Sequence, residues 1–403
     1  MGGATGRRAS YGRSAAASTV LLAPMVAFLV ATLIIPVMLM VVESARDVEV
    51  ATALPRTLAV LANWKPAEPI PDDAYSALGE DLKVAGSSRG KAATRLNLEM
   101  PGALSLVTGS FRALDEADGS DPKSVLVAHD PRWAKPEIWH AIRNAGGPWT
   151  DRFLLAAVDL KRDAQGKINL VPGSLYQSIY LRTFTVAIVV TGFCLVLGVP
   201  VALYLASLSP GKAVPLLLVL MLPLWTSVLV RAMAWILLLQ TSGLVNQTLI
   251  FLHLVTEPLR LVFNRTGVLI AMTHVLLPFM ILPAYNSMRT VSRDQLRAAG
   301  SLGATPLTVF RRVYLPQCRS GIAAGCLLVF ASASGYYITP ALVGGGADQM
   351  LGTYVELAAL RYSNQPLAAA LGVVFLVIFL ALVGAIALIL RPRTILQERR
   401  VRG

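Results

Sequence analysis

The residues best placed for a chemical or mechanical role lie in the stretch from Ser292 to Pro316, SRDQLRAAGSLGATPLTVFRRVYLP. Ser292 and Thr305 have side-chain oxygens that can cap helix N-termini, and Pro306 suits the first position of a helix. Gly303 stands where a helix can end in a left-handed turn. The spacing predicts two short helices hinged at Gly303, with Pro316 beyond the end of the second. Such a rigid projection is suited to being pushed by another protein.

The titratable side chains elsewhere do not form a catalytic or metal-binding motif. The four histidines are scattered, and the sequence contains no HExxH, no CxxC and no glycine-rich phosphate loop. Cys194 and Cys326 fall in apolar segments, and Cys318 falls in a basic one. We therefore expect no catalytic residue, no metal and no cofactor in this chain, and we expect it not to hydrolyse ATP because it lacks a phosphate-binding loop.

The composition is that of a membrane protein. The chain has 403 residues, of which 55% are hydrophobic, and its mean hydropathy is +0.60. Residues 43–167 contain 18 acidic and 16 basic residues, whereas the rest of the chain contains 5 acidic and 20 basic residues. The excess positive charge thus accompanies the segments that flank apolar stretches, and nucleic-acid binding is not expected.

Six stretches are long enough to cross a membrane, because a hydrocarbon core of about 30 Å needs roughly 20 apolar residues as helix. All but one are free of charge, and that one is interrupted only by Arg231. We predict an all-α integral membrane protein with six transmembrane helices and a helical external insertion between helices 1 and 2. A cleaved signal peptide at the first stretch is the alternative. The predicted spans are 14–42, 183–211, 213–239, 266–288, 320–347 and 362–390.

The direction of the chain follows from its short loops. Most of their arginines and lysines fall on one side if there are six spans, including the run of arginines between 289 and 320. The positive-inside rule then places both termini and the 289–320 loop in the cytoplasm, and the insertion outside.

The insertion, residues 44–175, is too long for a structureless loop and is expected to be a folded helical domain. Helices are predicted from Pro71, from Pro136 to Gly146-Gly147, and from Thr150. Two roles remain open: a docking surface for a partner protein, and a stabilising insertion without direct contact. The apolar faces are Tyr75, Leu78, Leu82 and Val84; Ile138, Trp139 and Ile142; and Phe153, Leu154, Ala157 and Leu160.

Polar groups inside the predicted spans are candidates for a solute path. Arg231 is the only charge deep in a span, and Pro223 can break the same helix. Arg231 either lines a path or braces two helices, or it lies close enough to the membrane surface to extend its charge into water. His274 and Asn286 are expected to be helix–helix hydrogen-bond partners. The candidates for the substrate path are Trp225, Thr226, Arg231, Trp235, Tyr336 and Tyr337.

Three segments carry a family resemblance. The spacing of Ala298-Ala299, Gly303 and Val313-x-Leu315-Pro316 resembles the signature loop of binding-protein-dependent ABC importer permeases, although Arg297 stands where that family has glutamate. Two further segments are similar to the spermidine/putrescine type of this family, which has a methionine-importer-like transmembrane core. They are LPLWTSVLVRAMAWILLLQTSGLVN and YITPALVGGGADQMLGTYVE. The similarity spans roughly 176–391, and the insertion matches only weakly.

The resemblance implies a permease subunit for a polyamine or related amine in the bacterial inner membrane, working by alternating access. Its implied partners are two ATP-binding subunits, a second permease subunit, an external solute-binding protein and membrane lipid. The implied ATPase-coupling residues are Arg297, Ala298, Ala299, Gly303, Val313, Leu315 and Pro316. The implied organisation is an N-terminus and first helix (1–43), the external (periplasmic) insertion (44–175), a transmembrane core (176–391) with its coupling loop (289–320), and a basic cytoplasmic tail (392–403).

Two other functions are weighed against this interpretation. A secondary transporter needs no ATPase, but it would show paired repeats with broken helices at matching positions, and the sequence has no clear second copy. A membrane sensor would use the insertion as a receptor, but the tail is too short for an output domain. For the loop itself, the alternative is an interfacial helix pair held by anionic lipid.

Overall fold

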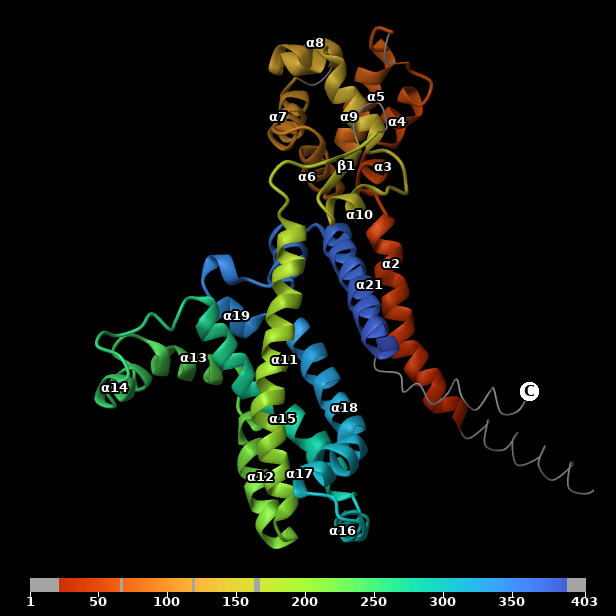
Figure 1. The fold of residues 1–403 in the computed structure, drawn as a ribbon. Helices are drawn as coiled ribbons and strands as arrows, with labels where there is room; N and C mark the ends of the chain where they lie inside the picture. The colour runs from red at the N-terminus through yellow and green to blue at the C-terminus, as the bar shows by residue number, and fades with distance from the viewer. Residues whose placement is uncertain (1–21, 66–67, 118–119, 163–166, 390–403) are drawn as a thin grey trace, which may run out of the picture. The chain divides into compact units, whose positions relative to one another are not determined.

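The computed structural model describes residues 22–65, 68–117, 120–162 and 167–389. The predictions for the basic N-terminal residues and for the tail 392–403 lie outside them. The chain divides into a first unit, up to Ala156 together with Gln365–Val373, and a second unit, Ala157–Asn364 together with the residues from Val374 onward. Apart from one short two-stranded sheet, the regular structure of the described residues is helical (Figure 1).

Six helices are long and apolar enough to cross a membrane, as predicted, and the all-α class is confirmed. One of them precedes the helical insertion and the other five follow it. They are Leu22–Ala45, Tyr176–Ser207, Val228–Phe251, Arg265–Arg289, Pro306–Ser334 and Gln365–Leu388. The segment Val228–Phe251 comprises two helices separated by residues 240–243.

The predicted third span, 213–239, is wrong as a single helix. It consists of α12 (Pro210–Trp225) and α13 (Val228–Leu239), and the short helix α14 (Leu244–Phe251) follows. Between α12 and α13, Thr226 has an extended backbone and Ser227 a non-helical one. The guanidinium of Arg231 donates to the Thr226 carbonyl (2.7 Å) and hydroxyl (3.2 Å). Arg231 thereby satisfies backbone groups that a helix end leaves without a partner.

Three helices form the packed centre of the second unit: α11 (Tyr176–Ser207), α15 (Arg265–Arg289) and α18 (Leu315–Ser334). Figure 1 shows them running alongside one another. Gly321 of α18 lies directly against the Pro283 carbonyl and Ser287 of α15, with no room for a Cβ atom. A Cβ on Gly325 would come within 2.9 Å of Met280 Sδ. Small residues at such contacts let helix backbones approach closely within a membrane.

The predicted fifth span, 320–347, also ends early. Helix α18 stops at Ser334, and the chain continues through α19 (Ile338–Val343), η4 (Gly346–Asp348), α20 (Leu351–Glu356) and η5 (Leu357–Arg361) before α21 (Gln365–Ile389). This segment is tied to the neighbouring helices. Arg182 donates to the Gln349 carbonyl at 3.0 Å, and Arg265 pairs with Asp348 at 3.1 Å.

The first unit contains the helical part of the insertion. After η1 (Val30–Ile34) and α2 (Ile35–Ala45), short helices enclose a core in which Trp133, Trp139 and Tyr75 are buried against one another. The helices are α3 (Glu49–Ala53), α4 (Pro55–Leu61), α5 (Asp72–Val84), α6 (Ser88–Glu99), α7 (Ala103–Glu116), α8 (Pro122–His129), η2 (Pro131–Ala134), α9 (Pro136–Asn144) and α10 (Arg152–Ala156).

The helices predicted from Pro71 and Pro136 are confirmed, and their apolar faces are buried except for Val84, which is 76% exposed. The third predicted helix is too long, because α10 ends at Ala156. In the second unit, β1 (Leu160–Arg162) pairs antiparallel with β2 (Ile168–Leu170), and this hairpin was not expected. The carboxylate of Asp159 accepts the backbone N–H groups of Tyr176 and Gln177 and so caps the first turn of α11.

A buried ion pair joins the beginning and the middle of the helical domain. Arg95 of α6 is 4% exposed and donates to Asp47, whose side chain is 2% exposed, with an Nη2–Oδ2 distance of 2.6 Å. Arg95 also pairs with Glu99 at 3.0 Å, and Arg152 of α10 contacts the same Glu99. Asp47 follows the end of α2 and donates its backbone N–H to the Pro148 carbonyl. The network therefore connects the point where the chain enters the domain with the point where it leaves.

Candidate coupling surface

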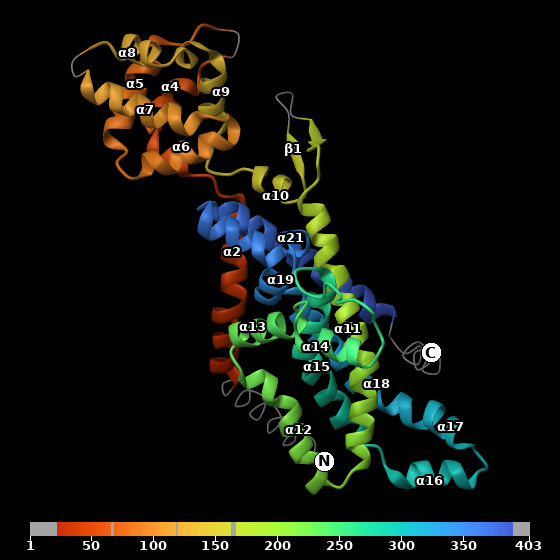
Figure 2. The ribbon, with the colours of Figure 1, turned by 90° about the vertical axis from the view of Figure 1, so that its left-hand side faces the viewer.

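The stretch 292–316 begins with the helix–glycine–helix geometry that its sequence predicts. Helix α16 (Arg293–Ser301) is capped by the Ser292 hydroxyl, which accepts from the Asp294 N–H at 3.3 Å. Gly303 has φ +85, in the left-handed region. The Thr305 hydroxyl then caps α17 (Pro306–Val309). We call residues 292–309 the knuckle, and it lies at the same end of the second unit as the α11–α12 turn (Figures 1 and 2).

The tip of the knuckle exposes apolar side chains. No residue of α16 is buried, Leu302 is 89% exposed and Leu307 is 65% exposed. A Cβ built on Gly303 would meet no atom within 4 Å. Glycine is therefore required there by the backbone conformation and not by crowding within this chain. Leu302 and Leu307 were not singled out from the sequence, although leucines in a polar, arginine-rich loop are a detectable signal.

The prediction that Pro316 lies beyond the second helix is wrong. Helix α17 continues through the π-helix η3 (Phe310–Tyr314) into α18, and Pro316 lies in the first turn of α18. Proline lacks the N–H that an α-helix needs, and its ring clashes with the carbonyl four residues earlier. The wider turn of η3, in which the Leu315 N–H bonds to the Phe310 carbonyl, accommodates this defect. Val313 and Leu315 consequently belong to one continuous helical rod that joins the knuckle to a transmembrane helix.

Arg297 points away from the protein and is 78% exposed. Its nearest carboxylate is Asp294, one turn earlier on α16, at 3.8 Å. A solvated pair at this distance contributes little to stability. The exposed face of α16 therefore presents an acidic side chain close to Arg297.

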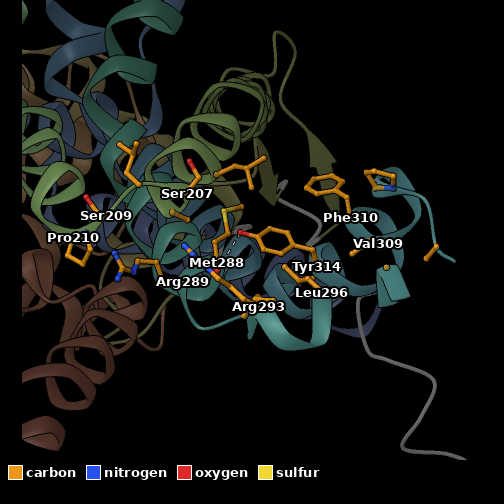
Figure 3. A pocket seen from close by; sticks show the side chains of 17 residues that line it. Ser207, Ser209, Pro210, Met288, Arg289, Arg293, Leu296, Val309, Phe310 and Tyr314 are labelled. Carbon is orange, nitrogen blue, oxygen red and sulfur yellow. Dashed lines mark hydrogen bonds between the residues drawn. The ribbon is translucent and has the colours of Figure 1, made fainter. Parts of the chain in front are cut away.

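A groove of about 920 Å³ lies behind the knuckle, between the α11–α12 turn and the segment from α15 to η3. In Figure 3, Met288, Arg289 and Arg293 lie between Ser209 and Pro210 on one side and Phe310 on the other. The Tyr314 hydroxyl donates to the Met288 carbonyl at 3.5 Å, and this bond links the end of α15 to η3.

The six candidates for the substrate path are not gathered in this groove. Trp225 is 73% exposed at the end of α12. Trp235 of α13 makes an edge contact with His274 of α15, with ring centroids 5.2 Å apart. Tyr337 packs against Gly352 at the start of α20. Helices α13 and α19 contact each other, so Trp235 and Tyr337 come from neighbouring elements. The ring of His274 thus contacts another helix, whereas Asn286 is exposed in this chain.

Six helical segments long and apolar enough to cross a membrane define a multi-pass membrane protein, and the knuckle is its most exposed apolar projection described above. Residues 198–396 match the family described as "Binding-protein-dependent transport system inner membrane component". The spermidine/putrescine transport system permease protein PotB of Escherichia coli (strain K12) is 36% identical over 205 residues, which cover 51% of this chain and 74% of that protein. The inner membrane ABC transporter permease protein YdcU of the same organism is 34% identical over 222 residues, covering 51% of this chain and 70% of that protein. A crystal structure of a bacterial ABC transporter that imports the acidic polysaccharide alginate aligns with a TM-score of 0.43 at 19% identity, covering 54% of this chain and 80% of that one.

The chain belongs to the family of binding-protein-dependent transport system inner membrane components. It is a permease subunit of an ABC importer that depends on a solute-binding protein. It is a multi-pass protein of the inner membrane and a transport component, not an enzyme.

Proposed function

We propose that this permease imports a polyamine or a related small amine, together with a second permease subunit, two ATP-binding subunits and an external solute-binding protein. The knuckle would dock on an ATP-binding subunit. The observation that carries this assignment is the exposed tip, where Leu302 lies next to the left-handed turn at Gly303. Isolated surface leucines are common, but one at the end of a capped, rigid projection is suited to a pocket on a partner.

The continuous rod from α17 through η3 to α18 supports a mechanical role. A displacement of the tip would reach Gly321 and Gly325, where α18 packs tightly against α15. Close-packed helix contacts shift between discrete arrangements and do not deform gradually. ATP-driven closure of the docked ATP-binding subunits would therefore move the transmembrane helices between outward-open and inward-open arrangements.

The proposed orientation places both termini and the 289–320 loop in the cytoplasm, and residues 44–175 outside. It rests on the distribution of arginine and lysine over the short loops. The proposed organisation keeps 1–43, 44–175, 176–391 and 392–403 as separate parts. The compact helical core around Trp133 and Trp139 supports a folded insertion, whose role as a docking surface or as a stabiliser stays open.

The substrate class is supported by relatives named as spermidine/putrescine permeases. Arg231 keeps its positive charge while its guanidinium bonds to the neutral groups of Thr226, so it would oppose a polycation that came close. Trp225, Trp235, Tyr336 and Tyr337 would offer aromatic faces to ammonium groups. Uptake of labelled spermidine into proteoliposomes that contain the assembled importer tests this class. Uptake of labelled molybdate without spermidine would contradict it.

Replacing Leu302 with aspartate is expected to prevent recovery of the ATP-binding subunits when the tagged chain is purified from its native membrane. The new carboxylate would have to be buried without a partner in the pocket that receives Leu302. Mass spectrometry of the purified material, with the second permease as internal standard, measures the loss.

Gln295→Asp is the matched control, because it adds the same charge to an exposed position on α16, away from the tip. It should retain the ATP-binding subunits. If the Leu302→Asp variant recovered as much of the ATP-binding subunits as the unsubstituted chain does, the tip would not be the docking point. Recovery of the unsubstituted chain alone would instead favour a secondary transporter or a sensor.

A further inference from the structure

The groove behind the knuckle combines an apolar wall with uncompensated positive charge. Leu203, Leu208 and Val291 contribute to its apolar surface and pack on the buried cluster between α11 and α15. Arg289 and Arg293 also line the groove, and no aspartate or glutamate of the described part of the chain does. Among the described residues, no carboxylate lies within ion-pair distance of either arginine. An occupant that satisfies both features must carry a negative group and an apolar chain.

Further groups at the same place favour an anion. The Arg289 guanidinium is held by a hydrogen bond of 3.1 Å to the Tyr285 hydroxyl, which leaves its other N–H groups available. Ser209 and Pro210 line the groove at the N-terminal end of α12, and the Ser209 hydroxyl does not cap that helix. The positive end of the α12 dipole adds to the attraction.

The position of the groove in the chain indicates where the occupant comes from. The apolar helix α11 ends at Ser207 and α15 ends at Arg289, so the groove lies where two spanning helices change from apolar to charged residues. This is the depth at which phospholipid headgroups meet a membrane protein, and basic pockets between helix ends bind anionic headgroups.

We propose that this groove binds one anionic phospholipid. Its phosphodiester lies against Arg289, Arg293 and the Ser209 hydroxyl, and an acyl chain lies along Leu203 and Leu208. Leu296 of α16 lines the same groove, so a bound lipid contacts both α11 and the base of the knuckle. The lipid therefore supports the position of the knuckle from behind, while Leu302 at the tip is free for the ATP-binding subunit. This site is independent of which solute the importer carries.

The test is native mass spectrometry of the assembled importer after exchange into phosphatidylglycerol or into phosphatidylcholine with the same acyl chains. We expect one phosphatidylglycerol per copy of this chain to survive detergent removal, and phosphatidylcholine to be lost. A hydrogen bond to a charged group contributes about 1.5–3 kcal/mol. Each of Arg289→Gln and Arg293→Gln should therefore weaken retention about tenfold or more. Arg293→Gln removes no hydrogen bond within the described residues, so its effect does not depend on a change in the fold.

Arg311→Gln/Arg312→Gln is the matched control, because both arginines are exposed on the same segment and neither lines the groove. It should retain the lipid. An equal loss in the control would mean non-specific attraction and would overturn the site. Displacement of the lipid by inorganic phosphate alone would assign the groove to a free anion. If the lipid binds the isolated chain but is absent from the assembled importer, the groove would be a contact surface for the ATP-binding subunit and not a lipid site.

Discussion

Replacing Gly303 with valine is expected to reduce solute-stimulated ATP hydrolysis by the assembled importer to its unstimulated level. Gly303 has φ +85, and a residue with a side chain costs about 1–2 kcal/mol in the left-handed region, more if it is β-branched. Steric crowding is not the cause, because a Cβ atom at this position would meet no atom within 4 Å. Relief of the strain would rotate α17 relative to α16, and Leu302 would move away from its docking position.

Gly300→Val is the matched control for this prediction. Gly300 also has open space around its Cβ position, but it lies within α16 with an ordinary helical backbone. Valine there should leave most of the stimulation in place. Both variants are assayed in proteoliposomes with the solute-binding protein, after quantification of the inserted chain. Full stimulation in the Gly303 variant would show that the left-handed turn is not used in coupling.

Replacing Arg95 with methionine is expected to destabilise the helical domain of the insertion by about 3–5 kcal/mol, because it leaves the buried Asp47 carboxylate without its partner. In the native protein the Arg95 Nε atom lies 2.9 and 3.0 Å from the two carboxylate oxygens, and Nη2 lies 2.6 Å from one of them. Pulse proteolysis of the full-length protein in increasing urea measures the change in the free energy of unfolding. Cleavage is followed between residues 46 and 152.

The same substitution at Arg56 is the control, because its pair with Glu80 has both side chains more than half exposed, at 56% and 64%. Such a pair contributes little to stability. The double variant Arg95→Met/Asp47→Asn should recover part of the lost stability, since no unpaired charge stays buried. A single Arg95 variant as stable as the native protein would contradict the assigned role of the pair.

Several parts of the protein could be derived from the sequence because their causes are local. Each spanning helix bonds its backbone within itself, so apolar length alone predicts six of them. The caps at Ser292 and Thr305 act on backbone N–H groups two or three residues away, and the turn at Gly303 follows from the ability of glycine to adopt a positive φ. The direction in which the chain crosses the membrane, which the arginines of the short loops indicate, stays a prediction.

Two of the predictions that were wrong concern places where a helix stops or changes its pitch. The interruption at Thr226 and Ser227 is maintained by the guanidinium of Arg231, five residues from Thr226, and no propensity scale contains such a bond. Pro316 was expected to lie outside a helix, yet the π-helix η3 allows the helical rod to continue past Pro316. In both cases hydropathy is the same whether the helix continues or breaks.

Sequence by itself determined the class of this protein, its number of spans and the local geometry of its knuckle. Tertiary structure alone decided three other features: the contact of Gly321 with α15, the burial of Asp47 with Arg95, and the groove that brings Ser209 near Arg289 and Arg293. The physical reason is sequence separation. Helix caps and apolar length depend on neighbouring residues, whereas buried ion pairs, glycine contacts and binding grooves depend on which distant segments pack together.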